Sequence, residues 1–277
     1  AASNNSSTIN GKTLLKKTTN GSELRFAVTV YDIPLEEYGN TISVLAYCKS
    51  NDVFYFSPIN VSRNIIEVAR NAYFGGNNQE FIEEIVDSTK VKVTSNNSSI
   101  KYYQDLSDVS LNNGDIIELS RFTYYGININ KNNVSIYGFN KDVDVNLERN
   151  NESVITSSIN IDAGVSNCVI NGCKFECDTA LVLNGNNDNL DFSYNICDYN
   201  SNYCIKDVNN NDTHNNIFIN NNLFNGLNNS YQKDIHLIGY ISGANRIENN
   251  IFEDSISGVK EDDFAIKLDK YRDDTYL

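Results

Sequence analysis

The chain has 277 residues, of which 40% are hydrophobic and 21% are charged, and its formal net charge is −14. Phosphate backbones and anionic membranes both attract basic surfaces, so this charge argues against a nucleic-acid partner and against adsorption to membranes. No apolar run approaches the length of a membrane span, and we expect no membrane insertion. The absence of Met, even at position 1, indicates a processed product or a segment of a longer protein.

The first part of the chain predicts short strands. Ala1–Asn10 is polar and carries no signal-peptide pattern. Alternating or β-branched apolar residues predict strands at Leu24–Val30, Thr41–Tyr47 and Val53–Phe56, with a hairpin turn at Lys49–Asp52.

Two short helices are predicted next. The expected N-cap of the first is Ser62, its apolar residues recur over Ile65–Ala72, and Gly75-Gly76 ends it. The second helix covers Gln79–Thr89. Its expected apolar face consists of Phe81, Ile82, Ile85 and Val86.

This part of the chain resembles a known module. The elements that carry the likeness are Ile33-Pro34, Tyr38, Ile42–Tyr47, Phe54–Ser57 and Ser62–Ala69, in that order. They are similar to Ig/fibronectin-like β-sandwich modules of secreted and surface-attached proteins of Gram-positive gut bacteria and their phages, over Leu24–Tyr73. The resemblance implies attachment through protein partners rather than catalysis. Such modules have more strands before this part, and only Thr8–Leu15 is left to supply them here, so the sandwich is incomplete or completed by another chain.

From about Val91 the sequence consists of short strands between turn-rich stretches. The predicted strands are Asp115–Leu119, Val134–Gly138, Ser158–Ile161, Cys168–Phe175 and, near the end, Phe264–Leu268.

Four segments of this second part can be aligned with one another. They begin at Ile170, Phe192, Ile219 and Ile247, and each passes from an apolar residue through small or amide side chains to Phe or Cys. A period in the twenties with short apolar segments is typical of a solenoid of stacked strands.

The alignment also predicts which side chains stack on one another. Asn195, Asn222 and Asn250 share one position, where amide side chains can hydrogen-bond from coil to coil. A neighbouring position is expected to stack the rings of Phe175, Phe224 and Phe252 in the interior.

The apolar segments Val134–Gly138, Val154-Ile155, Ile159–Ile161 and Val165–Phe175 resemble those of right-handed parallel β-helices of the pectin-lyase-like superfamily. The likeness extends through Phe252. The predicted fold is therefore all-β, with an N-terminal β-sandwich-like module in residues 1–75, a helical linker in 76–94, and a right-handed parallel β-helix (solenoid) in 95–277. The alternative for the last part is a β-sandwich with unrelated Asn-rich loops.

The catalytic patterns of that superfamily are missing. Polygalacturonase-type hydrolases carry Gly-His-Gly and Arg-x-Lys motifs beside paired Asp residues, and neither motif occurs here. The run Glu261-Asp262-Asp263 is interpreted as a solvated loop. A lyase needs several Asp on one face for Ca²⁺ and an Arg or Lys base. The residues available for such a site are Asp188, Asp191 and Asp212, spread over the repeats, with Arg246 and Arg272 after Arg149.

Histidines and tyrosines offer weaker signals. His214 lies two residues after Asp212, and His236 two after Asp234, but no nucleophile motif accompanies either, and both are interpreted as turn or surface residues. Exposed Tyr side chains would stack on sugars, whereas β-propensity places many of them in strands. The candidates are Tyr102-Tyr103, Tyr124-Tyr125 and Tyr137.

The six cysteines are Cys48, Cys168, Cys173, Cys177, Cys197 and Cys204. We interpret them mainly as buried free thiols, and a Cys173–Cys177 or Cys197–Cys204 bridge remains an alternative. No Cys-x-x-Cys pair exists, so zinc ligation is not expected.

Three classes of function remain open. The favoured one is a non-catalytic extracellular structural or adhesive module, on a bacterial cell surface or in a phage fibre (virion), with a cell-surface or host polysaccharide as a ligand and a homotrimer expected for a fibre. The alternatives are a polysaccharide lyase or glycoside hydrolase of the pectin-lyase-like type, and a carbohydrate-binding accessory domain. No catalytic, cofactor-binding or metal-binding residue is assigned.

Overall fold

The computed structural model describes residues 14–20, 23–29, 33–77, 79–199, 203–209, 211, 213–226, 233–254 and 264–271. The chain forms two compact units, Ala1–Asp87 and Ser88–Leu277. Their boundary falls within the segment 76–94 that was expected to link two domains. Both units consist mainly of strands, and the second contains long parallel sheets.

The first unit contains two antiparallel hairpins and a short 3₁₀ helix, η1 (Leu35–Glu37). The hairpins are β1 (Leu14–Asn20) with β2 (Glu23–Thr29), and β3 (Ile42–Ser50) with β4 (Val53–Arg63). The turn predicted before Val53 is confirmed, since Asn51 and Asp52 have φ of 49° and 62°, a conformation that Asn and Asp tolerate. Within the described residues, each hairpin is a separate two-stranded sheet.

Both predicted helices are present, as α1 (Ile65–Phe74) and α2 (Glu80–Ser88). The predicted N-cap was wrong. The cap of α1 is Asn64, whose side-chain oxygen accepts a hydrogen bond of 2.6 Å from the Glu67 N–H. Ser62 remains in β4, where its hydroxyl meets that of Ser43 on β3 at 2.8 Å. Strand pairing therefore holds Ser62 out of the helix.

Helix α1 ends at Gly75 as predicted. The apolar face of α2 is narrower than expected, because Ile82 and Val86 are buried whereas Phe81 is 58% exposed. Phe81 precedes Ile82 by one residue, which turns its side chain about 100° around the helix axis from that of Ile82.

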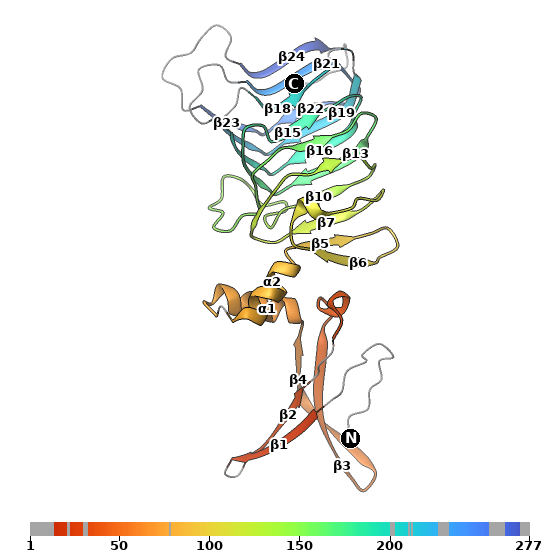
Figure 1. Cartoon of the computed structure of the whole chain (residues 1–277), viewed down its shortest axis with the longest axis vertical. Coiled ribbons are helices and arrows are strands. Elements are labelled where there is room, and N and C mark those ends of the chain that lie inside the picture. Colours follow the sequence, from red (N-terminus) through yellow and green to blue (C-terminus); the bar gives the residue numbers. More distant parts are fainter. Residues whose placement is uncertain are drawn as a thin grey trace. The chain divides into compact units, whose positions relative to one another are not determined.

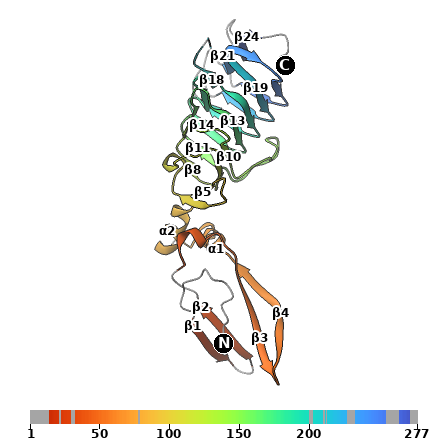
Figure 2. The same ribbon diagram turned by 90° about the vertical axis from the view of Figure 1, so that its right-hand side faces the viewer.

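The second unit is built from three ladders of parallel strands (Figures 1 and 2). The chain visits the three ladders in turn, and each pass through all three forms one coil. The first ladder contains β7 (Ile116–Leu119), β10 (Ser135–Tyr137), β13 (Ser166–Asn171), β16 (Asp188–Ser193), β19 (Thr213–Asn220) and β22 (Arg246–Glu248). The second contains β8 (Thr123–Tyr124), β11 (Val154–Ile155), β14 (Lys174–Cys177), β17 (Ile196–Tyr199), β20 (Leu223–Gly226) and β23 (Ile251–Asp254). The third contains β9 (Asn128–Ile129), β12 (Ile159–Ile161), β15 (Leu181–Leu183), β18 (Tyr203–Asp207), β21 (Lys233–Ser242) and β24 (Phe264–Tyr271).

Two features complete this arrangement. The long strand β21 pairs with both β18 and β19, and so joins the first and third ladders into one 14-stranded sheet. The hairpin β5 (Val91–Thr94) and β6 (Ile100–Tyr103) pairs antiparallel with β7, and η2 (Leu106–Asp108) follows it. β5 thus covers the edge that β7 would otherwise present for pairing with another chain.

The register of the first ladder confirms the sequence alignment. Ile170 pairs with Phe192, Phe192 with Ile219, and Ile219 with Ile247. The strand predicted at Cys168–Phe175 is corrected, because the chain bends after β13 and continues as β14 in the second ladder. Gly172 forms this bend with φ of 73°.

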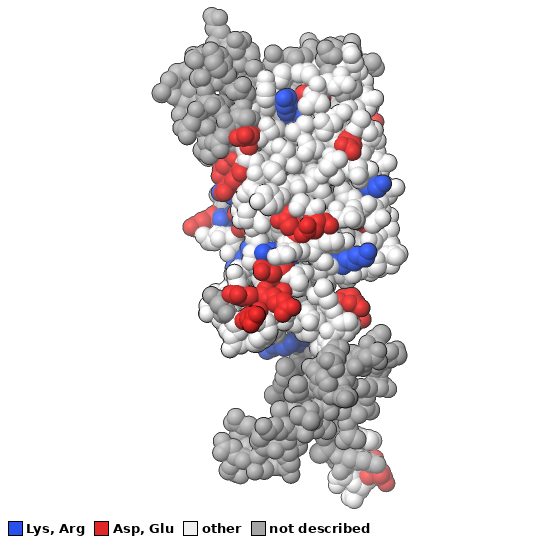
Figure 3. Space-filling view, in the orientation of Figure 1, with Lys and Arg blue, Asp and Glu red and all other residues white. Residues whose placement is uncertain are grey.

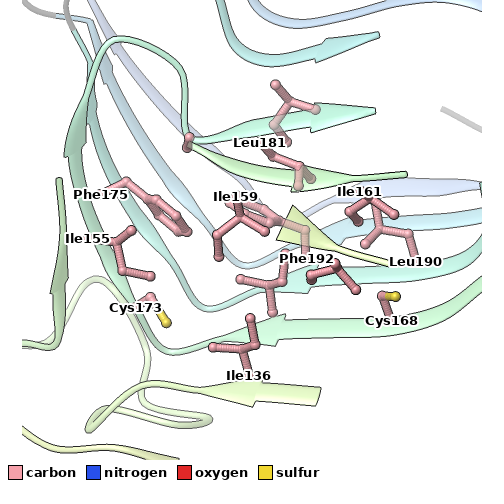
Figure 4. Close-up of a cluster of buried hydrophobic side chains, with 14 of the residues drawn as sticks. Ile136, Ile155, Ile159, Ile161, Cys168, Cys173, Phe175, Leu181, Leu190 and Phe192 are labelled. Carbon is pink, nitrogen blue, oxygen red and sulfur yellow. The ribbon is translucent and has the colours of Figure 1, made fainter. Parts of the chain in front are cut away.

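Inward-facing side chains of all three ladders meet in one core, as the labelled residues of Figure 4 show. The predicted ring stacking is confirmed for Phe224 and Phe252, whose ring centroids lie 5.1 Å apart with planes inclined by 10°. Phe175 does not stack on Phe224, because Cys197 lies between them in the second ladder. The ring centroid of Phe175 lies instead 5.7 Å from that of Phe192 in the first ladder. Phe224 is fully buried.

The asparagine ladder is also confirmed. Asn222 is fully buried, and its side-chain oxygen accepts from the Asn195 N–H at 2.9 Å. Its amide nitrogen donates to Phe192 O at 2.9 Å and to the side-chain oxygen of Asn250 at 3.0 Å. Asn195 continues the ladder downward by accepting from the Cys173 N–H at 3.0 Å. Each amide therefore satisfies backbone groups that the bend leaves unpaired.

A second set of positions explains the abundance of Asn. Six residues that lie shortly before or within the first-ladder strands have φ between 55° and 80°, a left-handed conformation that Gly and Asn adopt with least strain. These residues are Gly114, Asn133, Asn167, Asn189, Asn216 and Gly243. Three of them also hydrogen-bond side chain to side chain, Asn216 to Asn189 and Asn189 to Asn167, each at 2.8 Å.

Candidate functional site

One coil of the second unit is longer than its neighbours and carries a loop, residues 139–153, between β10 and β11. The Ser153 hydroxyl accepts from the Phe139 N–H at 2.9 Å and closes the base of the loop. Asp142 holds the loop to the first ladder, because its N–H donates to the Asn171 side chain and its carboxylate accepts from the same side chain, both at 2.9 Å. The loop is therefore fixed against the outer face of β13.

Arg149 fixes the other end of this loop. Its side chain is only 2% exposed and donates to Glu152 at 2.8 Å and to Tyr194 O at 2.9 Å. Tyr194 occupies a left-handed bend, so the guanidinium satisfies a carbonyl at the corner of a coil. Arg149 is engaged in structure and is not positioned as a base for a ligand on the outer face.

Four polar residues form what we term the outer-face cluster: Asp142, Asn171, Asp191 and Ser193. The Asn171 amide nitrogen bridges two of them, donating to Asp142 at 2.9 Å and to the Ser193 hydroxyl at 3.1 Å. Asp191 and Ser193 are both on β16, two residues apart, and flank the buried Phe192. Strand alternation therefore places both on the outer face of the first ladder.

The cluster perturbs one of its carboxyl groups. Burial raises the pKa of Asp191 above the usual aspartate value, and the negative charge of Asp142 raises it further. The Ser193 hydroxyl opposes the shift; its oxygen accepts from Asn171, which leaves its proton free to donate. One Asp191 oxygen, Oδ1, is buried without a hydrogen-bond partner, as is Oδ1 of Asn220 on β19. Both oxygens lie beneath the surface, although Asp191 and Asn220 as residues are half-buried rather than buried.

Asp191 has neighbours at the same register position on the next strands of the first ladder. On β19, Phe218 pairs with Asp191 of β16 on one side and with Arg246 of β22 on the other. A carboxylate, an aromatic ring and a guanidinium group therefore follow one another across the ladder. Arg246 is exposed and lies 3.9 Å from Glu248. Acidic side chains cover more of the face shown in Figure 3 than basic ones do, in keeping with the net charge of −14.

The acidic residues singled out in the sequence do not gather. Of the three proposed for a lyase, Asp191 belongs to the outer-face cluster. Asp188 is used for structure, since it accepts from the Asn215 N–H at 2.9 Å and from its amide at 2.7 Å. Asp212, Arg272 and the run Glu261-Asp262-Asp263 lie outside the described residues. In the described part of the chain, no three His, Cys, Asp or Glu side chains are close enough to hold a metal ion.

His214 is a core residue, which corrects the prediction of a turn or surface histidine. It is fully buried, and its Nε2 lies 3.1 Å from the carboxylate of Asp207, which is also buried. Nδ1 accepts from the Asn187 N–H at 3.4 Å, which leaves Nε2 to donate to Asp207.

Asp207 is surrounded by donors. Burial alone would raise its pKa, but hydrogen bonds from His214 and from the N–H groups of Asn209 and Gly239 lower the pKa below the usual aspartate value. The N–H of Ile238 also donates to its carboxylate at 3.1 Å. The pair therefore fastens the bend of β21 and is closed to a substrate.

His236 and the candidate tyrosines differ in their surroundings and in their exposure to solvent. His236 stacks on Tyr203 with ring centroids 5.2 Å apart. Tyr124 is 1% exposed and donates to Ser120 O at 2.9 Å, whereas Tyr125 is 66% exposed. Tyr137 is half-buried beneath the Lys141 ammonium, 3.8 Å from the ring centroid.

Five cysteines are free and buried, as predicted; the side chain of Cys48 lies outside the described residues. Burial raises the pKa of Cys168 to about 11 and those of Cys173 and Cys177 to about 12. Their thiols are therefore protonated near neutral pH and are poor nucleophiles.

The sequence missed most of the outer-face cluster. Asn171 and Ser193 occupy equivalent positions of the repeat and were identified only as small or amide side chains of the aligned segments. Asp142 lies in the inserted loop, outside the repeat, so no spacing could connect it to them. The residue type and register at positions 171 and 193 were the available signal.

No helix in the described part of the chain has the length and apolar character needed to span a membrane. Comparisons with models of protein families, with curated proteins and with solved structures found no match to this chain.

Proposed function

We propose that the chain is a non-catalytic extracellular module of a bacterial cell-surface protein or a phage fibre, with a structural or adhesive role. In this proposal the three ladders close into a right-handed parallel β-helix of the pectin-lyase-like kind, and the first unit attaches the chain to protein partners. The hydrogen bonding between coils supports this proposal. The polar side-chain atoms of Asn222, Asp188 and Asp207 form hydrogen bonds to neighbouring coils or at bends. Such bonding favours a rigid support over a reactive centre.

The outer-face cluster supplies the adhesive part of the proposal. Its ligand is a polysaccharide, because sugar hydroxyls can donate to the half-buried carboxylate of Asp191 while a ring face packs on the half-buried Phe218 beside it. The inserted loop prearranges Asp142 and Asn171, which lowers the entropic cost of binding.

Binding of soluble glycans to the full chain tests this proposal. We would titrate a neutral β-glucan, a chitin oligosaccharide and polygalacturonate, and compare Asp191→Asn with Asp198→Asn. Asp198 is the matched control, because it is also an outward aspartate but lies in the second ladder, 3.0 Å from Lys174. We expect Asp191→Asn to weaken binding of the recognised glycan about tenfold, the value of a hydrogen bond to a charged group. No binding to any glycan, or equal effects of the two substitutions, would contradict the adhesive role.

One observation favours the alternative of a polysaccharide lyase or glycoside hydrolase. A carboxyl group whose pKa is raised by burial and by a second carboxylate is the arrangement that a general acid requires, and Asp191 beside Asp142 has it.

The assembly state of the chain distinguishes a phage fibre from a bacterial cell-surface protein, the two versions of the favoured proposal. Light scattering of the full chain should give a trimer for a phage fibre and a monomer for a cell-surface protein.

A further inference from the structure

The third ladder carries basic residues at one register position of three successive strands. Lys206 of β18 pairs with His236 of β21, and His236 pairs with Lys267 of β24. Adjacent strands lie about 4.8 Å apart, so the two lysine positions are about 10 Å apart with the histidine between them. We term these three residues the basic row. It stands out on a chain whose net charge is −14.

The basic row lies on the outer face of the third ladder. Ile205 and Ile235 pair with each other and are fully buried, whereas Lys206 and His236, each one residue later, are half-buried. Successive side chains of a strand point to opposite faces of the sheet, so Lys206 and His236 point away from the core. Lys267 takes the same register position on β24.

An aromatic ring holds two members of the row together. The rings of Tyr203 and His236 stack, with centroids 5.2 Å apart and planes inclined by 22°. The Lys206 ammonium lies 5.6 Å from the centroid of the same Tyr203 ring, within the range of a cation–π interaction. Tyr203 therefore fixes where the imidazole and the ammonium lie, and such prearrangement lowers the entropic cost of binding a ligand.

The charge of Lys206 is not neutralised by a carboxylate. Within the part of the chain that the structure describes, its ammonium forms no ion pair. Lys174, a half-buried lysine of the second ladder, is instead held by two acidic side chains at 2.6 and 3.0 Å. Asp207 follows Lys206 directly and Asp234 lies two residues before His236, but each aspartate is only 1% exposed. The groups of Lys206 and His236 that reach solvent are therefore basic.

We propose that the basic row binds the anionic groups of an acidic polysaccharide. Carboxylate or sulfate groups of the polymer pair with Lys206 and Lys267, and an imidazole N–H of His236 donates to a group between them. A row of cations along stacked strands matches the regular charges along a linear polymer. This inference rests on the proposed adhesive role and adds a preference for charge, but it uses the third ladder and not the outer-face cluster.

The test titrates the full chain at pH 7 and low salt with polygalacturonate, with dextran sulfate and with uncharged dextran. We expect at least one of the two polyanions to bind, and dextran not to bind. The polyanion that binds distinguishes carboxylate from sulfate, and added salt should weaken the binding because it screens the charges. Lys206→Gln should weaken the binding about fivefold, the upper value for one exposed ion pair, and Lys206→Arg should retain it.

Lys174→Gln is the matched control, because it removes the same charge from a half-buried lysine of another ladder, and it should leave the affinity unchanged. The proposal is overturned if neither polyanion binds, or if Lys206→Gln and Lys174→Gln weaken binding equally. Asp191→Asn separates the two surfaces. Binding that Lys206→Gln weakens and Asp191→Asn does not would support the basic row and contradict the outer-face cluster, and the reverse pattern would contradict the basic row.

Discussion

Asparagine fills two kinds of position in the second unit, and they place different demands on the side chain. At Asn189 and Asn216 the backbone conformation matters most, because φ near 55° is tolerated by Gly and Asn. At Asn195 and Asn222 the buried amide matters most, because it replaces backbone partners at the bend. Gly should therefore replace the first kind with little loss, whereas only a side chain with both donor and acceptor can replace the second.

Asn222→Ala tests the second role. The substitution leaves the Asn195 N–H and the Phe192 carbonyl buried without partners, and each such group costs about 1–3 kcal/mol. We expect the free energy of unfolding, measured with urea, to fall by about 2–5 kcal/mol. Asn225→Ala is the control, since Asn225 is half-buried and its amide donates to Asp198 at 3.2 Å; it should cost less than about 1 kcal/mol. Equal losses would show that the buried ladder adds no stability of its own.

Two aspartates should shape the pH dependence of stability in opposite directions. The folded-state pKa of Asp207 is lowered, so its contribution is fully present above the unfolded value of about 3.9 and is lost as pH falls through the folded value. The folded-state pKa of Asp191 is raised, so its charge reduces stability as pH rises through that value.

Urea midpoints between pH 3 and pH 7 check both signs. Asp191→Asn is expected to stabilise the protein at pH 7 relative to the parent, and Asp207→Asn to destabilise it there while flattening the decline below about pH 4. Stabilisation by Asp207→Asn at pH 7 would show that the burial cost of this carboxylate outweighs its four hydrogen-bond donors.

At the scale of the strand and its bend, Gly172 determines where β13 ends and β14 begins. A Cβ at this position would lie 2.5 Å from backbone atoms of Asn140 and Lys141, and the φ of 73° adds strain. Gly164 has a similar φ of 78° with open space around it. Gly164→Ala should therefore cost about 1–2 kcal/mol from the dihedral alone, and Gly172→Ala clearly more. Similar losses in thermal unfolding would mean that the inserted loop moves aside freely.

The stacked rings make the corresponding prediction for packing between strands. Phe224 is fully buried against Phe252, and Phe224→Ala should lower the free energy of unfolding by about 3–5 kcal/mol. Phe218 is the matched control, since it lies on β19, the strand that precedes β20 in sequence, with its side chain half-buried on the outer face. Phe218→Ala should cost less than half as much. A larger loss at Phe218 than at Phe224 would contradict the assignment of inner and outer faces.

The elements differ in how well the sequence predicts them, for physical reasons. The strands containing Ile170, Phe192, Ile219 and Ile247 could be aligned because each coil buries the same face and repeats the same bend. Strands such as Thr123–Tyr124 and Asn128–Ile129 were missed because two residues carry no periodicity. Their position follows only from pairing with neighbouring coils.

Long-range contacts account for the remaining errors. The cap of α1 could not be chosen from sequence, because Ser62 is an equally good cap until β4 pairs with β3. His214 was assigned to the surface because its partner, Asp207, precedes it by seven residues on another strand. The outer-face cluster combines the repeat with the inserted loop, and only the folded chain connects Asp142 with Asn171.

At the scale of the whole second unit, three ladders share one core, and most polar side chains near it are bonded between coils or at bends. This arrangement resists local opening, because each coil is held by backbone pairing, by buried amides and by stacked rings. In the outer-face cluster, Asp191 has a buried oxygen without a hydrogen-bond partner and a raised pKa. The proposed adhesive role therefore requires that this cluster bind a glycan without cleaving it.

To test this requirement, the purified chain is incubated with the glycan that it binds. New reducing ends and the absorbance of unsaturated sugar products are then assayed. For an adhesive module we expect neither signal to rise above the blank with the parent chain, while Asp191→Asn weakens binding. Cleavage by the parent chain that Asp191→Asn abolishes, and that Asp198→Asn leaves intact, would rule out a non-catalytic role. It would identify Asp191 as a catalytic acid, because loss of such a group costs on the order of 10²-fold or more in rate.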